Sequence, residues 1–149
     1  MIYLTPNYAL ELSIVDYLNS QNTVSGSLLS GSNISYYTGI GNVTLNTGSI
    51  VKVDASQFTE VAPYTRNYEF SVNIEVFEMA ADTTGSYLGV LAGAVFNEFV
   101  NTTTAAQNIT NAGLGINVWN VREARMSPGF SGDALTNTIN VTVVGAMVI

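Results

Sequence analysis

The chain of 149 residues contains no cysteine and no histidine. The missing cysteine excludes disulfides, thiolate metal sites and thiol nucleophiles. The missing histidine removes the usual general base near neutral pH and the commonest metal ligand in proteins. The phosphate-loop, dinucleotide, serine-hydrolase and zinc-protease motifs are absent as well. The composition therefore favours a protein that is not an enzyme and that needs no cofactor and no metal.

Charge is also scarce, because only 10% of the residues are charged and only 4 are Lys or Arg against 11 Asp or Glu. Four positive charges neutralise few phosphates, so we do not expect the chain to wrap nucleic acid. Hydrophobic residues make up 47% of the chain, and much of the rest is Asn, Thr, Ser and Gly. A lone domain usually keeps a more charged surface for solubility. This surface is better suited to burial against neighbouring subunits.

Long hydrophobic runs are lacking too. The most apolar stretch, "GSYLGVLAGAVFNEFV", is uncharged and apolar only over residues 87–96, which is about half of a membrane span. Gly85, Gly89 and Gly93 lie four residues apart and share one stripe of a helix. We interpret the stretch as a core helix whose glycines allow close packing, and we expect no membrane association. The first residues lack the features of a signal peptide.

Two helices are expected. In "TPNYALELSIVDYLNSQ", Thr5 stands at the N-cap and Pro6 at the first helical position. Its predicted apolar stripe consists of Tyr8, Leu12, Val15 and Leu18. In the glycine-containing helix, the predicted stripe consists of Leu88, Leu91, Val95 and Phe99. This helix is expected to end in the segment "NTTTAAQNITNAG".

The clearest strand is "YEFSVNIEVFEM", in which apolar and polar residues alternate strictly over residues 68–76. One face of this strand is therefore expected in the core and the other at a wet surface or an interface. Two further strands, "LGINVWNV" and "ALTNTINVTVVGAMVI", are joined by "REARMSPGFSGD", which we predict to be a polar connection. The predicted polar face of the last strand consists of Thr136, Thr138, Asn140 and Thr142.

Residues 22–47 are rich in Ser, Gly and Asn, and they are predicted to form a loop or hairpin insertion with short strands at 34–37 and 43–45. "SIVKVDAS" then predicts another short strand. The whole chain, residues 1–149, is predicted to be one α+β domain. In this domain a mostly antiparallel β-sheet carries two α-helices packed on one face.

The few charged side chains are the candidate contact residues. Two glutamates share the polar face of the clearest strand, but six residues separate them by roughly 20 Å, so they form no acid/base pair. The forked donors of arginine suit ion pairs with carboxylates, within the chain or between subunits. The candidate inter-subunit or lumen contacts are Glu60, Arg66, Glu69, Glu75, Arg122, Arg125 and Asp133.

The order of these segments resembles that of a known family. A helix near "YALELSIVDYLNSQ" is followed by a variable loop and by "TEVAPYTRNYEFSVNIEVFEMAADTT", a long strand that ends in an Ala-Asp-Thr turn. A helix follows, and then the strand pair of "GINVWNVREARMSPGFSGDALTNTINVTVVGAMV". This layout, which covers most of the chain, resembles the tail terminator (tail completion) proteins of long-tailed bacteriophages.

The resemblance implies a structural role in the virion. Such proteins form a hexameric ring on the last ring of the tail tube, stop tube polymerisation and join the tail to the neck. The implied partners are copies of the same chain, the tail tube protein, neck or connector proteins and, as a further candidate, a sheath. DNA would pass through an acidic lumen without specific binding. The implied location is the tail–neck region of the virion, after assembly in the host cytoplasm.

Two alternatives remain open. The first alternative is a tail tube subunit, which is built on a related fold, or another neck or connector subunit. A carbohydrate-binding, adhesin-like module is the second alternative, because Trp119 and the pair Tyr36 and Tyr37 could stack on sugars.

Overall fold

The computed structural model describes residues 4–21, 34–39, 49–61, 65–78, 86–131 and 134–147. These residues form three helices and five strands. In chain order they are α1 (Pro6–Ser20), β1 (Ile34–Thr38), β2 (Ser49–Glu60), β3 (Asn67–Glu78), α2 (Ser86–Val100), α3 (Thr102–Asn111), β4 (Ile116–Ser131) and β5 (Ala134–Met147).

All five strands belong to one mixed sheet in the order β1-β2-β3-β5-β4. The pairing of β1 with β2 is parallel, and the other three pairings are antiparallel. Since β1 pairs only with the first residues of β2, up to Val53, the rest of β2 has no strand on its outer side among the described residues. The other edge of the sheet is β4.

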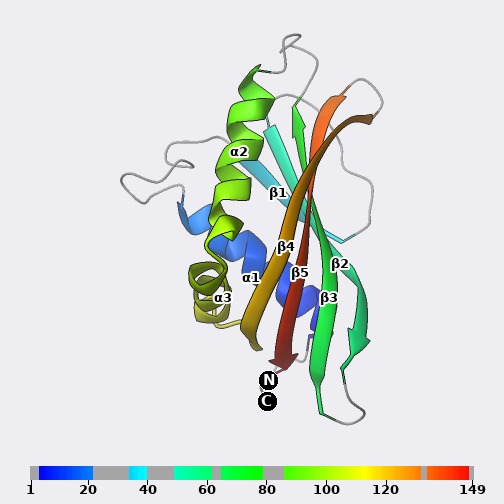
Figure 1. Cartoon of the computed structure of the whole chain (residues 1–149), viewed down its shortest axis with the longest axis vertical. Helices are drawn as coiled ribbons and strands as arrows, with labels where there is room; N and C mark the ends of the chain where they lie inside the picture. The colour runs from blue at the N-terminus through cyan, green and yellow to red at the C-terminus, as the bar shows by residue number, and fades with distance from the viewer. Residues whose placement is uncertain are drawn as a thin grey trace.

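The three helices lie on one side of the sheet, behind and to the left of the strands in Figure 1. The apolar residues of β3 point to that side, and all four of Phe70, Val72, Ile74 and Val76 are fully buried, as their alternation predicts. Helix α1 packs mainly on β2, α2 on β3 and β5, and α3 on β4. The fold is therefore α+β, with the helix layer on one face of the sheet.

Helix α1 begins at Pro6, as predicted, although the side chain of Thr5 makes no capping hydrogen bond. Its predicted apolar stripe is correct only in part, because Leu18 is fully buried but the buried side of the helix is rotated by part of a turn. Tyr8 is exposed and lies on the outer side of the helix. The stripe that contacts the sheet instead includes small and polar residues, which a search for large apolar side chains misses. It consists of Ala9, Leu10, Glu11, Ser13, Ile14, Tyr17 and Leu18.

Helix α2 buries Leu91, Val95 and Phe99, as its sequence pattern predicts. The predicted role of its glycines is not confirmed. A Cβ atom placed on Gly93 would meet no atom within 4 Å, so this glycine does not allow a close approach of a neighbouring element. Gly85 lies outside the described residues.

Helix α3 is a third helix where the sequence predicted only the end of the second. Asn101 separates the two helices and caps the new one, because its side-chain oxygen accepts a hydrogen bond of 3.2 Å from the backbone N–H of Thr104. The helix ends before Gly113, whose φ of +73° suits a residue without a side chain. The expectation of two helices is therefore wrong.

Strand β4 runs without interruption to Ser131, through the segment that was predicted to be a polar connection. Pro128 and Gly129 made that segment look like a loop. At the edge of a sheet, however, the missing N–H of proline can face away from the neighbouring strand, so the ladder tolerates it. Arg122 and Arg125 consequently lie on a strand and have fixed neighbours on β5.

The insertion contains one of its two predicted strands. The strand predicted at 34–37 is β1, whereas the strand predicted at 43–45 lies outside the described residues. Strand β2 extends four residues beyond its predicted end, past a β-bulge between Asp54 and Gln57. A bulge breaks the alternation of side chains, which explains why the sequence pattern did not show this extension.

Candidate functional site

The side of the sheet opposite the helices is a polar surface, which we call the open face. Residues that pair directly across antiparallel strands point to the same side, so the registers place four rows of side chains across β2, β3, β5 and β4. None of these sixteen side chains is buried. The rows are the Glu69 row (Thr59, Glu69, Val144, Asn120), the Ser71 row (Gln57, Ser71, Thr142, Arg122), the Asn73 row (Asp54, Asn73, Asn140, Arg125) and the Glu75 row (Lys52, Glu75, Thr138, Ser127).

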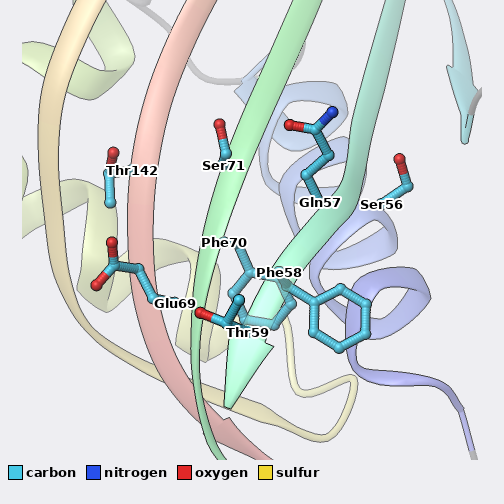
Figure 2. Close-up of a pocket in the computed structure, with 8 residues that line it drawn as sticks. All are labelled: Ser56, Gln57, Phe58, Thr59, Glu69, Phe70, Ser71 and Thr142. Carbon is cyan, nitrogen blue, oxygen red and sulfur yellow. The ribbon is translucent and has the colours of Figure 1, made fainter. Parts of the chain in front are cut away.

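A shallow hollow of about 390 Å³ lies in the open face, over β2 and β3. Figure 2 shows Gln57, Ser71 and Thr142 at one level of the sheet, with Glu69 and Thr59 at the next. The lining side chains offer hydroxyl, amide and carboxylate groups, together with the rings of Phe58 and Phe70. Such an open hollow suits contact with a surface or with water better than enclosure of a small molecule.

The sixteen described side chains of the open face carry no net charge. It contains Lys52, Arg122 and Arg125, which are three of the four basic residues of the chain. It also contains three of the eleven acidic residues, Asp54, Glu69 and Glu75. The net charge of −7 is therefore carried by the rest of the chain. The resemblance implied an acidic lumen, whereas the described basic residues are concentrated on this side of the sheet.

Two of the predicted contact residues meet on the open face, as a pair that the sequence did not predict. Arg122 on β4 and Glu69 on β3 form an ion pair of 3.2 Å across the intervening strand β5. Both side chains are almost half exposed, so this pair contributes little to stability, on the order of 0–1 kcal/mol. Arg125 lies opposite Asn140 and makes no ion pair within the described part of the chain.

Two other predicted residues lie away from the open face. Glu60 ends β2, and Arg66 lies in the turn to β3, where its backbone N–H donates a hydrogen bond of 3.2 Å to Glu60 Oε2. Arg66 has a φ of +58°, a left-handed conformation that is strained for a residue with a side chain. Asp133, the last predicted contact residue, lies outside the described residues.

The predicted polar face of β5 is correct for Thr138, Asn140 and Thr142 and wrong for Thr136. Thr136 is only 7% exposed. It pairs with Phe77 of β3, which in turn pairs with Ile50 of β2, and both of these side chains are buried as well. The open face therefore ends beyond the Glu75 row, where the sheet becomes covered.

The bulge in β2 is anchored by a buried carboxylate of α1, which is not among the residues of the predicted apolar stripe. Glu11 of α1 is 2% exposed, and its Oε2 accepts a hydrogen bond of 2.8 Å from the backbone N–H of Ala55 inside the bulge. Burial raises the pKa of Glu11, the hydrogen bond from Ala55 opposes this effect, and the charge of nearby Asp54 adds to it. Glu11 thus holds the part of β2 that borders the hollow.

A bulge in β4 is anchored in the same way from α3. The backbone N–H of Val118 donates a hydrogen bond of 2.8 Å to Thr110 Oγ1, and this hydroxyl donates one of 2.9 Å to the carbonyl of Ala106. In the bulge, Trp119 and Asn120 together oppose Val144, a residue of the open face. Trp119 is 51% exposed and lies at the β4 edge of this face.

The helices and β1 meet at a second group of polar side chains, on the opposite side of the sheet. The hydroxyl of Tyr17 on α1 donates a hydrogen bond to Glu98 Oε2 on α2. Burial, together with Glu98, raises the pKa of Tyr17 to about 12 and that of Tyr36 on β1 to about 12. These groups join three elements of the domain, and we assign them a structural role.

The aromatic residues considered for sugar stacking do not form a platform. Tyr36 and Tyr37 are neighbours in β1, so their side chains point to opposite faces of the sheet. Trp119 lies on β4, at the other edge of the sheet. No observation among the described residues therefore favours the carbohydrate-binding alternative.

Within the described ranges, no helix is long and apolar enough to cross a membrane. The same residues contain no group of three or more acidic side chains that could hold a metal ion. A scan against models of known protein families finds no match for this chain, and no curated protein matches it.

Proposed function

We propose that this chain is a structural virion protein that forms a ring, of about six copies, at the tail–neck junction of a long-tailed phage. In this role it caps the tail tube and joins it to the neck, and the open faces of the copies line a lumen through which DNA passes. The proposal rests on the resemblance of the segment order, and the fold supports it. Three of the four strand pairings are antiparallel, and the helices pack on one face of the sheet.

The observation that carries the proposal is the open face. Four strands present sixteen accessible side chains, mostly Thr, Ser, Asn and Gln, with three basic and three acidic groups in balance. A neutral wall releases few counterions from DNA, and binding through phosphates is correspondingly weak. A hydrophilic wall of this kind suits a channel in which DNA must move without being held.

The mass of the purified protein in solution tests the ring. Native mass spectrometry and light scattering should give a particle of about six chains of 15.9 kDa each. The particle should not retain duplex DNA at low salt, because the lining carries no net positive charge. A protein that stays monomeric at every accessible concentration and is absent from purified virions would refute the proposal.

The copy number per virion distinguishes a terminator from the nearest alternative, a tail tube subunit. A terminator contributes one ring to each virion, whereas a tube subunit contributes many. Quantitative mass spectrometry of purified virions, with the major capsid protein as the internal standard, would distinguish the two.

A further inference from the structure

Over the same three rows, neither edge of the open sheet has a further strand beside it among the described residues. On one edge, β2 pairs with no strand on its outer side after Val53, so Asp54, Gln57 and Thr59 stand at the edge of the sheet. On the other edge, β4 is the last strand of the sheet within the same described ranges, although Thr110 of α3 bonds its backbone at Val118. The free edge of β2 and the facing part of β4 belong to the Glu69, Ser71 and Asn73 rows. A copy placed beside another at the same height could therefore bring these edges together.

The strand directions allow such a contact. Strand β4 runs antiparallel to β5, β5 antiparallel to β3, and β3 antiparallel to β2. Strand β4 is consequently antiparallel to β2. Rotation about an axis roughly along the strands keeps every copy at one height, and it sets β4 of one copy antiparallel to β2 of the next. Different surfaces then meet head to tail, which is the arrangement that closes into a ring.

The charges at the two edges are complementary within one row. In the Asn73 row, Asp54 stands at the β2 edge and Arg125 at the β4 edge, three strand spacings or about 14 Å apart. The two charges therefore do not neutralise each other within one chain, and Arg125 has no ion-pair partner among the described residues. In a row that continues into the next copy, Arg125 of one copy faces Asp54 of its neighbour.

Trp119 supplies an apolar anchor at the same edge. It is 51% exposed and lies next to Asn120, the residue at the β4 end of the Glu69 row. The other end of that row is Thr59, beside the hollow over β2 and β3 (Figure 2). Tryptophan and arginine are among the residue types most enriched at positions that dominate binding energy. The bulges in both strands interrupt the hydrogen-bond ladder, so side chains must carry the contact and indiscriminate edge pairing is disfavoured.

We propose that copies of this chain associate head to tail through these two edges, with Arg125 and Trp119 of one copy against Asp54 and Thr59 of the next. This inference rests on the proposed ring and names the contact that builds it. The partner surface is a second copy of the same chain, and the open faces of successive copies then join into one continuous lining.

A charge-reversal experiment tests this contact. Arg125→Glu and Asp54→Arg each place like charges at the contact, and we expect each to raise the dissociation constant between copies at least about tenfold. An equimolar mixture of the two variants should reassemble into a ring of alternating copies. In that ring the introduced glutamate faces the introduced arginine at one contact, and the native Arg125 faces the native Asp54 at the next. Asp16→Arg, the same charge change on the exposed side of α1, should leave the assembly unchanged.

Native mass spectrometry at matched concentrations is the readout, and circular dichroism shows that each variant is folded. The carboxylate of Asp54 accepts a hydrogen bond of 2.9 Å from the N–H of Ser56, so Asp54→Arg could also disturb the local fold. Recovery of the ring in the mixture would show that this variant is folded well enough to assemble. If both folded variants keep the wild-type ring, or if the mixture fails to reassemble, the contact is wrong and the ring proposal stands. If the wild-type protein is itself monomeric, both proposals fail.

Discussion

Gly145 in β5 and Gly93 in α2 should respond in opposite ways to substitution by alanine. A Cβ atom at Gly145 would lie 2.8 Å from the carbonyl oxygen of Asn117 and 3.3 Å from the Cα of Val118. Both are backbone atoms at the start of the β4 bulge, so they cannot move aside as a flexible side chain would. At Gly93 the added methyl group would meet no atom within 4 Å.

The size of each effect follows from these surroundings. Gly145→Ala forces the backbones of β4 and β5 apart, and overpacking of this kind costs about 1–3 kcal/mol of unfolding free energy. Gly93→Ala relieves the conformational cost of a glycine inside a helix and should stabilise the domain by about 0.5–1 kcal/mol. Each kcal/mol corresponds to about 2–4 °C in Tm for a domain of this size.

Urea unfolding followed by circular dichroism, at one protein concentration for all samples, measures both effects. The chain has a single tryptophan, Trp119, which lies in the bulge next to Val118, so its fluorescence reports on the same region. Gly145→Ala should shift the emission of the folded protein, and Gly93→Ala should not. Equal stability of Gly145→Ala and the wild type would refute the close approach of β4 and β5. A destabilised Gly93→Ala would instead restore the close-packing role that the sequence suggested for the α2 glycines.

Two further substitutions test the turn before β3 and the anchor of the β2 bulge. Arg66→Gly should raise the unfolding free energy by up to about 1 kcal/mol, because Arg66 has a φ of +58° and glycine adopts it without strain; a loss of stability in urea would contradict this. Glu11→Gln keeps an oxygen acceptor for the N–H of Ala55 but cannot ionise. Since burial raises the pKa of Glu11 above 4.5, its protonated form stabilises the fold below that pH, and this stability is lost as the pH rises through the folded pKa. The stability of Glu11→Gln relative to the wild type should therefore increase between about pH 4 and pH 8, and an unchanged difference would argue against a buried, titrating Glu11.

Local sequence patterns predicted those parts of the fold in which one period continues without interruption. The alternation around Phe70 and Glu69 predicted β3, its buried side and its polar side. Helix α1 was predicted to start at Pro6, and it does. The patterns failed where a single residue changes the local geometry. Asn101 starts a new helix after a short break, and Pro128 is tolerated because β4 is an edge strand.

The candidate site could be predicted only in part, because it depends on pairing between distant strands. The sequence identified Glu69 and Arg122 as scarce and charged, but only the register of β3, β5 and β4 brings them within 3.2 Å. The same register puts Asp54 and Arg125 in one row, which no local spacing indicates. Glu11 was missed because its burial depends on a bulge in a different strand.

Cryo-electron microscopy of the purified oligomer is the most direct test of the proposed role. We expect a closed ring in which the Ser71 and Asn73 rows face the central channel and the three helices form the outer wall. Within that ring, Arg125 of each copy should lie beside Asp54 of the next. A ring with the helices facing the channel, or a particle without a central opening, would contradict the assignment of the open face as the channel lining.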